Sequence, residues 1–477
     1  MQITMKKWGN WLLRAAKWLA VGFAALAVLV VSCWYFLPDE TLLPEAQAAL
    51  DKKPQIPSAQ NAFYPLLGLT ASPELDATAV GIQIAKVLEA ATPDSGTAAR
   101  KSVDALLGSA PFQRRSPQGP YCRNANETAS CLDAFVAHRV AIEAQWKSAA
   151  PFIQRYRALR ALPDFEETSW DLWGTHGFGE WFEIAELVDA KIALDMATPA
   201  LRAAALGELH QEILLTLGIV RQSDSLITQQ VFAAQLRKKL RLAADLLSRY
   251  PDIALTHADA VAQITQPLKP HDVQLKRVML GEFRTAAAAE NRNRLKFAEM
   301  AVQPEATAAA AWWRSTMWRV LYKPNATINM LYRARQSDGD FYSQSAVAIQ
   351  SALGQRARPR HDPEYAFNLL DPRWILYNPM GKIMASMANG LQFQEYGDRL
   401  NDLLAFSRLL ELERQMLVGR ISPDHALAFV ANAGPALANP YTEQPMQYDP
   451  THHTLTFSAK SQRTLDTGTN IIRLTRM

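Results

Sequence analysis

The stretch from Trp170 to Glu183 holds the side chains that are best suited to chemistry. Its fourteen residues include three tryptophans, two phenylalanines, three glycines, one histidine and three acidic residues. Aromatic neighbours can desolvate a carboxyl group and raise its pKa until it exchanges protons near neutral pH. His176 with Glu180 and Glu183 is therefore a candidate catalytic set, which could activate water or bind a divalent metal.

A helix that begins near Phe178 would have to position this set. Glu180 and Glu183 then share one face of the helix, and His176 lies just before its first turn. The same pattern also has a structural interpretation. Acidic residues in a first turn oppose the helix dipole, and aromatic-rich turns often pack onto a helical core. The stretch thus predicts either a hydrolytic site or a turn packed for stability.

Linear signatures of several common enzymes are missing from the sequence. HExxH, GxSxG, GxxxxGK[ST] and SxxK do not occur, and three cysteines cannot form paired CxxC knuckles. We therefore expect no cofactor and no metal site, and a non-catalytic role is favoured while catalysis stays open.

Other polar runs are interpreted as solvated helix faces. Glu208, His210 and Glu212 are spaced two residues apart, which spreads them around a helix. The basic run 237–239 with Arg241 is expected to face solvent as well.

An apolar stretch from Trp18 to Leu37 predicts a membrane anchor. It has twenty residues and no charge, and as a helix it is long enough to cross a bilayer. Basic residues precede it and acidic residues follow, so residues 1–17 are expected to be a cytoplasmic tip. This predicts a single-pass protein of the bacterial inner membrane, with its C-terminal body in the periplasm.

The cysteines fit an oxidising compartment. Cys122 and Cys131 are the only cysteines beyond the anchor, eight residues separate them, and they predict a disulfide. Val30–Cys33 resembles a lipoprotein cleavage motif, which would leave Cys33 lipidated. The aromatic residues that follow Cys33 favour an uncleaved anchor instead.

The charge balance argues against a nucleic-acid partner. The chain has 50 basic and 46 acidic residues, and residues 1–17 hold four of the basic ones and none of the acidic ones. The remainder is therefore formally neutral, without the general basic surface that nucleic acids require. The expected partners are the lipid bilayer through Trp18–Leu37 and another protein of the envelope.

The predicted fold class is all-α, with the anchor, a multi-helical body built as an irregular array of helix hairpins, and a small C-terminal β-hairpin. Prolines mark a spacer at 38–60, the body covers 61–434, and a proline-rich tail covers 435–477. In the tail, 454–458 and 470–475 alternate as strands do, and 446–448 is a candidate third strand.

Helical periodicity and cap residues divide the body into helices. Ser72 and Pro73 are expected to open one that runs to about Ala91. Others are predicted at 178–196, 199–221, 224–249, 268–288, 304–322, 340–353, 379–389, 393–418 and 422–432.

Several blocks of the sequence together resemble a known group of proteins. They are Asn61–Leu69, the cysteine pair, Ser225–Ile227, Asn378–Lys382 and Asn439–Pro445. With the anchor, their order is similar to that in single-pass, mostly helical envelope proteins of proteobacteria, a group with no assigned activity. The last block resembles the group's Asp-Pro-aromatic-Thr-Gly-x-Pro segment, with asparagine for Asp and glutamate for Gly. The resemblance implies an envelope location and brings no catalytic residues.

Together these observations predict a membrane-anchored helical protein that acts as a binding or scaffolding module in the cell envelope. The alternative is a hydrolase of the envelope that uses His176, Glu180 and Glu183.

Overall fold

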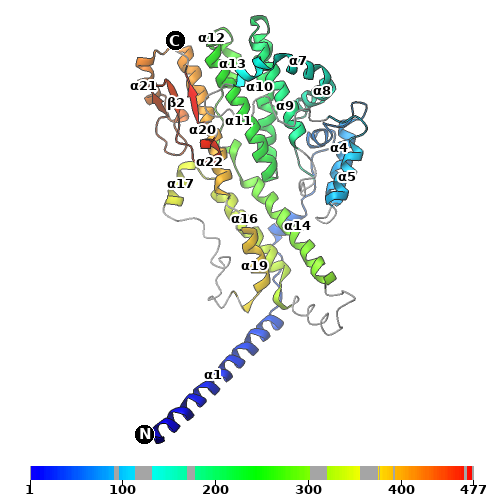
Figure 1. Cartoon of the computed structure of the whole chain (residues 1–477), viewed down its shortest axis with the longest axis vertical. Coiled ribbons are helices and arrows are strands. Elements are labelled where there is room, and N and C mark those ends of the chain that lie inside the picture. The colour runs from blue at the N-terminus through cyan, green and yellow to red at the C-terminus, as the bar shows by residue number, and fades with distance from the viewer. Residues whose placement is uncertain are drawn as a thin grey trace. The chain divides into compact units, whose positions relative to one another are not determined.

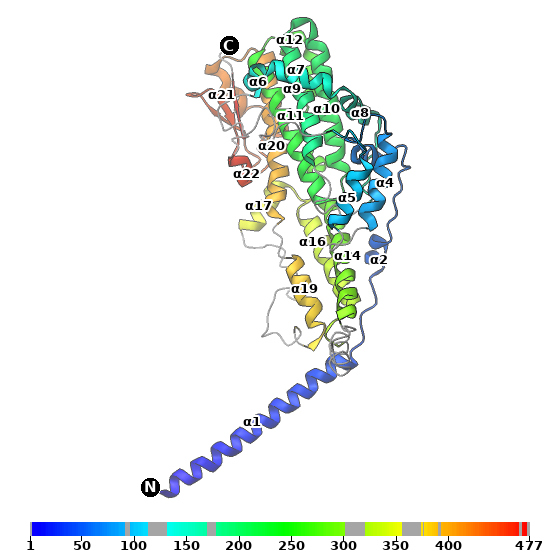
Figure 2. The ribbon, with the colours of Figure 1, turned by 45° about the vertical axis from the view of Figure 1, so that its right-hand side comes forward.

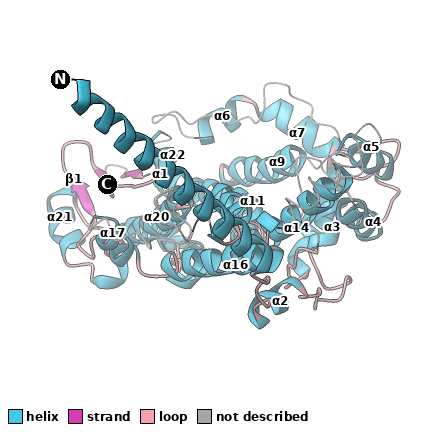
Figure 3. Ribbon diagram, turned by 90° about the horizontal axis from the view of Figure 1, so that it is seen from below, coloured by secondary structure: helices cyan, strands magenta, loops and turns pink. Residues whose placement is uncertain are grey.

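The computed structural model shows a mostly helical chain (Figure 1). It describes residues 2–90, 96–112, 131–168, 178–300, 320–354, 374, 376–389, 393–466 and 470–474. Within these residues, strands occur only in one small sheet near the C-terminus (Figure 3). The predicted helical class with a small β element is confirmed.

Contacts divide the chain into two compact units, each discontinuous in sequence. The first contains Met1–Lys52, Phe283–Ser337 and Pro359–Leu391. The second contains Lys53–Glu282, Asp338–Arg358 and Gln392–Met477. Residues 38–52 of the predicted spacer belong to the first unit, and residues 61–434 contribute to both units.

The first unit begins with α1 (Gln2–Phe36), which contains all of the predicted anchor except its last residue, Leu37. Two described segments are long and apolar enough to cross a membrane, Ala15–Ser32 in α1 and Pro199–Gln222 in the second unit. None of the first is buried, whereas half of the second is, as in a core helix of a soluble domain. Thus α1 has the length and the exposed apolar surface that an anchor needs.

The rest of the first unit is a small helical core. Phe283, Leu331 and Ala46 are among its buried apolar residues. Its elements are α2 (Pro44–Leu50), the later part of α14 (Lys276–Met300), α16 (Pro324–Phe341) as far as Ser337, and α19 (Pro379–Asn389).

The segment directly after α1 is bound to the start of α16. Asp39 accepts hydrogen bonds from the backbone N–H groups of Asn325 at 2.9 Å and Ala326 at 3.1 Å. It therefore acts as an N-cap supplied from elsewhere in the chain. Asn329 donates to the Glu40 carboxylate at 3.0 Å. The first residues of the predicted spacer are thus fixed to a helix.

Asn378 joins the start of α19 to the start of α16. Its φ of 50° is left-handed, a conformation that asparagine tolerates better than most residues. Its side chain accepts from the Lys323 N–H at 2.8 Å and donates to Thr327 Oγ1 at 3.0 Å. A Cβ at Gly381 would lie 2.0 Å from that same Oγ1. The Asn378–Lys382 block is therefore a tight helix junction.

The second unit starts with α3 (Phe63–Leu67) and α4 (Ala77–Ala90). The prediction that Ser72 and Pro73 open this helix is wrong, because α4 begins at Ala77 and Asp76 accepts from the Ala79 N–H at 2.6 Å. Ser72 Oγ instead accepts from the Ala110 N–H at 2.6 Å. Ser72 therefore bonds to a backbone group distant in sequence and does not cap α4.

Three long helices form the centre of the second unit. They lie side by side in Figures 1 and 2 and bury residues such as Leu187, Leu209 and Leu236. The three are α9 (Phe178–Met196), α10 (Arg202–Gln222) and α11 (Leu226–Arg249). The predictions at 178–196, 199–221 and 224–249 are confirmed to within a few residues.

Shorter helices and one further long helix complete the second unit. Most of the helix predicted at 304–322 falls outside the described residues. The remaining α-helices are α5 (Gly96–Leu106), α6 (Cys131–Ala137), α7 (Arg139–Ser148), α8 (Ala150–Ala158), α12 (Ile253–Thr256), α13 (Ala258–Ile264), α17 (Ala346–Gly354), α20 (Gln394–Val418), α21 (Pro423–Ala431) and α22 (Gln462–Asp466). The 3₁₀ helices are η2 (Leu159–Ala161), η3 (Pro199–Leu201), η4 (Pro270–Val273) and η5 (Pro435–Leu437).

Cys131 is the first residue of α6. Because Cys122 lies outside the described residues, the disulfide between them stays a prediction.

The small sheet has three antiparallel strands in the order β1 (Gln447–Asp449), β2 (Thr454–Thr456) and β3 (Ile471–Arg473). The predicted hairpin is therefore extended by the candidate third strand, shifted by one residue. Leu455 pairs with Ile472, and both are buried against the helices.

The turn before the sheet is shaped by Asn439 and Glu443. Asn439 Oδ1 accepts from the Tyr441 N–H at 3.0 Å, a bond that aspartate could also form. Glu443 has a φ of 56°, a left-handed conformation that glycine adopts without strain. The turn thus carries a conformational cost at Glu443.

Asp402 of α20 holds the chain that leads into and out of this sheet. It accepts from the Tyr441 hydroxyl at 2.6 Å and from the Ser461 N–H at 3.0 Å. Asp398 lies one turn earlier. Burial raises the pKa of Asp398 to about 7, with the charges of Asp402 and Glu395 adding to the rise.

We expect Asp398 to make the protein less stable at pH 8 than at pH 5. A carboxyl group whose pKa is higher in the folded state binds more protons when folded, so stability falls as pH rises from about 4 to about 7. About two of these pH units lie above pH 5, so the loss between pH 5 and pH 8 should be about 3 kcal/mol, since one pKa unit corresponds to about 1.4 kcal/mol. Urea unfolding of the full chain should show a flatter pH profile for Asp398→Asn. Asp259→Asn, at an exposed site, should keep the original slope; an unchanged slope in Asp398→Asn would contradict the assignment.

Candidate functional site

The structure places only part of the predicted catalytic set. His176 lies outside the described residues, so its convergence with the two carboxylates stays a prediction. Glu180 and Glu183 are half-buried in the first turns of α9. Glu183 accepts from the Gln145 side-chain amide of α7 at 2.7 Å. That bond gives Glu183 a role in joining two helices.

The chain that precedes the predicted site is fixed by Glu167. This residue is 1% exposed and accepts from the backbone N–H groups of Asp224 at 2.8 Å and Ser225 at 2.7 Å. The Thr228 hydroxyl donates to it at 2.6 Å. Burial raises the pKa of Glu167 to about 7 although these bonds lower it. The start of α11 thus binds an internal carboxyl group.

A buried ion cluster lies between α9, α10 and α11. Lys239 is fully buried, and its Nζ is 2.8 Å from Asp189 Oδ1 and 2.7 Å from Glu212 Oε2. The expectation that Glu212 and Lys239 face solvent is wrong. Each occupies the buried face of its helix because the other supplies the opposite charge.

The cluster continues toward α8 and the surface. Tyr156 donates to Glu212 at 2.8 Å, and Arg160 bridges Glu212 at 2.6 Å and Glu208 at 2.7 Å. Burial opposes ionisation of Glu212, but the charges of Lys239 and Arg160 hold its pKa below the ordinary value. Because each charged group has an oppositely charged partner, the cluster joins helices.

Within the described residues, no group of three or more His, Cys, Asp or Glu side chains could hold a metal ion.

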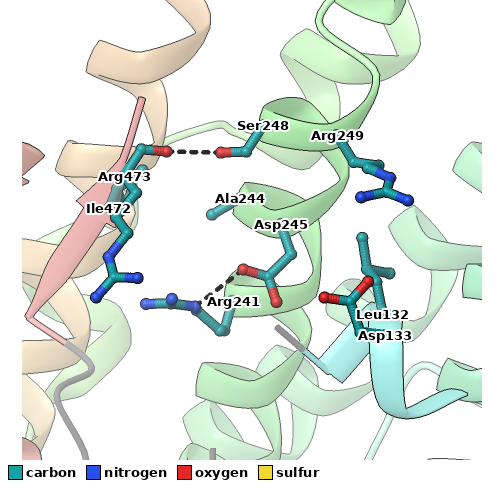
Figure 4. A pocket seen from close by; sticks show the side chains of 9 residues that line it. All are labelled: Leu132, Asp133, Arg241, Ala244, Asp245, Ser248, Arg249, Ile472 and Arg473. Carbon is teal, nitrogen blue, oxygen red and sulfur yellow. Dashed lines mark hydrogen bonds and ion pairs between the residues drawn. The ribbon is translucent and has the colours of Figure 1, made fainter. Parts of the chain in front are cut away.

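A cavity of about 230 Å³ lies between α6, α11 and β3. It is the candidate functional site, since charged side chains from three separate parts of the chain surround it (Figure 4). Its lining consists of Leu132, Asp133, Arg241, Ala244, Asp245, Ser248, Arg249, Ile472 and Arg473.

One wall of the cavity is β3, held by side chains of α11. In the part of the chain that the structure describes, β3 pairs only with β2 and is an edge strand. Arg241 donates to the Ile471 carbonyl at 2.7 Å, and Ser248 donates to the Arg473 carbonyl at 2.8 Å. These bonds satisfy outward carbonyl groups of the edge strand and block its pairing with another strand.

The cavity carries an excess of positive charge. Three arginines face two aspartates, and Arg241 is paired with Asp245 at 3.2 Å. Arg249 is the last residue of α11, and its side chain is exposed. A guanidinium group presents several donors in a plane, which suits a carboxylate or a phosphate.

Sequence reasoning missed this site, although part of it left a signal. Arg241, Asp245 and Ser248 are spaced by four and three residues, which places them on one helix face. The sequence pattern assigns Arg241 to a solvated face and does not single out Asp245 or Ser248. Nothing local relates that face to Asp133 or to Arg473, because these meet it only in the folded chain.

Comparisons of the chain with protein-family models, with curated proteins and with solved structures found no significant match.

Proposed function

We propose that the chain is a single-pass protein of the bacterial inner membrane whose periplasmic body is a binding module. The exposed apolar surface of α1 and the basic residues before it support the anchor and its orientation. The neutral charge of the remainder supports a protein partner in the envelope over a nucleic acid. An oxidised Cys122–Cys131 pair belongs to the same proposal.

The cavity between α6, α11 and β3 carries the more specific part of the proposal. Its guanidinium groups outnumber its carboxylates, so it favours an anionic group, either a carboxylate or a phosphate. The module thus binds an anionic end group of its partner.

The volume of the cavity favours an end group over a whole ligand. About 230 Å³ is below the roughly 300–1,000 Å³ of most sites that enclose a small molecule. A carboxylate or phosphate attached to a larger partner needs only its terminal atoms enclosed. This supports a binding module, whereas a hydrolase would also have to hold the bond that it cleaves.

The test is ligand-induced stabilisation of the full chain in lipid nanodiscs. Acetate and inorganic phosphate, compared at equal ionic strength, should raise the melting temperature, and their relative effect separates the two chemistries. Acetamide, which has the shape of acetate without its charge, should have no effect.

Arg249→Gln should weaken anion binding about tenfold or more, because a hydrogen bond to a charged group contributes about 1.5–3 kcal/mol. Arg100→Gln makes the same charge change at an exposed site on α5 and should leave binding unchanged. Equal stabilisation by acetate and acetamide, or equal loss in the two variants, would rule out the cavity as an anion site.

A further inference from the structure

Ser248 has two hydrogen-bond acceptors beside it and one hydroxyl hydrogen. Its Oγ lies 3.0 Å from Glu413 Oε1 and 2.8 Å from the Arg473 carbonyl oxygen. A hydroxyl group donates one hydrogen bond at a time. Both contacts are therefore satisfied together only when Glu413 carries a proton and donates it to Ser248, which then donates to Arg473.

The surroundings of Glu413 also favour its neutral form. Its side chain on α20 is 1% exposed, and its Oε2 is buried and has no hydrogen-bond partner among the described residues. A buried carboxylate with an unsatisfied oxygen is costly, and protonation removes the charge. Burial accordingly raises the pKa of Glu413 well above its ordinary value.

The charged groups around Glu413 largely offset one another. On α11, Asp245 raises its pKa and Arg241 lowers it, and those two are paired with each other at 3.2 Å. On α20, Glu411 is paired with Arg414 at 2.6 Å. On β3, Arg473 lines the cavity and presents its carbonyl to Ser248. The hydrogen-bond count therefore decides the state of Glu413.

We propose that Glu413 is held as the neutral acid and that its proton, through Ser248, keeps the β3 wall of the anion cavity in place. The effect on anion binding rests on the proposed function. The protonation of Glu413 does not depend on it. Regulation follows from the geometry, since the proton on Glu413 determines which acceptor receives the Ser248 hydrogen.

Ionisation of Glu413 has two consequences for the cavity. The Ser248 hydroxyl turns to the carboxylate, so the Arg473 carbonyl loses this donor, and of the two described bonds from α11 to β3 only the one from Arg241 to Ile471 remains. A negative charge also appears behind the cavity wall. Both changes disfavour an anion, so anion affinity should fall as pH rises through the ionisation of Glu413.

The proton is tested by infrared spectroscopy of the full chain in nanodiscs at neutral pH. The difference spectrum between the wild type and Glu413→Gln should contain the carbonyl band of a protonated carboxyl group. Glu89→Gln, at an exposed site on α4, should instead remove a carboxylate band. A carboxylate band in the Glu413 difference spectrum would overturn the assignment.

The regulatory step is tested with sulfate, whose charge is constant over about pH 6 to 9. Affinity for the wild type should fall at least about tenfold across the ionisation. Glu413→Gln, whose amide can still donate to Ser248, should retain the low-pH affinity throughout. Identical pH profiles for the two proteins would overturn the link.

Ser248→Ala gives an independent readout, because it removes the hydroxyl and keeps the acid. The carboxyl band of Glu413 should shift to that of an acid without a hydrogen bond, and amide exchange at residues 471–474 should accelerate. Unchanged exchange would overturn the role of Ser248. If no anion binds the wild type at any pH, the proposed function fails, while the infrared and exchange results still decide the state of Glu413 and of β3.

Discussion

Replacing Lys239 by methionine should lower the free energy of unfolding by about 3–5 kcal/mol. Lys239 is fully buried and forms ion pairs with Asp189 and Glu212. Methionine has a similar length but no charge, so two carboxyl groups would be left in the core with too few cations. Removing one partner of a buried ion pair is costly because the remaining charge stays buried, with neither a counter-ion nor water to stabilise it. Urea unfolding of the full chain, followed by tryptophan fluorescence, measures the change.

The adjacent residue provides the control. Lys238 is exposed on the same helix, so Lys238→Met makes the same chemical change and should alter stability by no more than about 0.5 kcal/mol. Adding Glu212→Gln to Lys239→Met should recover part of the loss, because it removes an unpaired charge. Equal effects of the two lysine variants would show that the cluster does not stabilise the core.

Gly281→Ala should destabilise the second unit by about 1–3 kcal/mol, and more if α14 cannot move. A Cβ at Gly281 would lie 1.7 Å from the backbone carbonyl oxygen of Asp224. Asp224 is itself held by Glu167 through its N–H and by Arg277 through its carboxylate at 2.9 Å. Because Asp224 is held through both its backbone and its side chain, its carbonyl oxygen cannot move away at low cost, so α14 must shift.

Gly207→Ala should instead stabilise the protein. A Cβ at this position of α10 meets nothing within 4 Å, and alanine is favoured over glycine in a helix by about 1 kcal/mol. The two variants make the same change, so helix propensity alone predicts equal stabilisation. Thermal unfolding of both would separate propensity from packing; stabilisation of both would refute the close approach of α14 to Asp224.

Helix positions were largely predictable because periodicity is a local property of the chain. The segments 178–196 and 379–389 were predicted with the bounds that α9 and α19 have. The strands of the tail were predicted from alternation and prolines in the same way. The early helix was misplaced, since Ser72 bonds to Ala110 and no longer caps the helix.

The interpretation of charged helix residues failed for a different reason. Glu212 and Lys239 look like solvated residues in a one-dimensional pattern, because burial of either charge alone is prohibitive. Burial becomes acceptable only when the two meet at 2.7 Å across two helices. Sequence patterns do not state which charges will meet, so they assign both to the surface.

By itself, the sequence determined the apolar N-terminal helix, the helical class, many helix bounds and the strands of the tail, because each depends on residues close together in the chain. Only the tertiary structure decided the division into two units and the cavity where Arg241, Asp133 and Arg473 meet. It also decided the contact of Ser248 with Glu413. These features depend on contacts between distant segments, whose pairing follows from the packing of the whole fold.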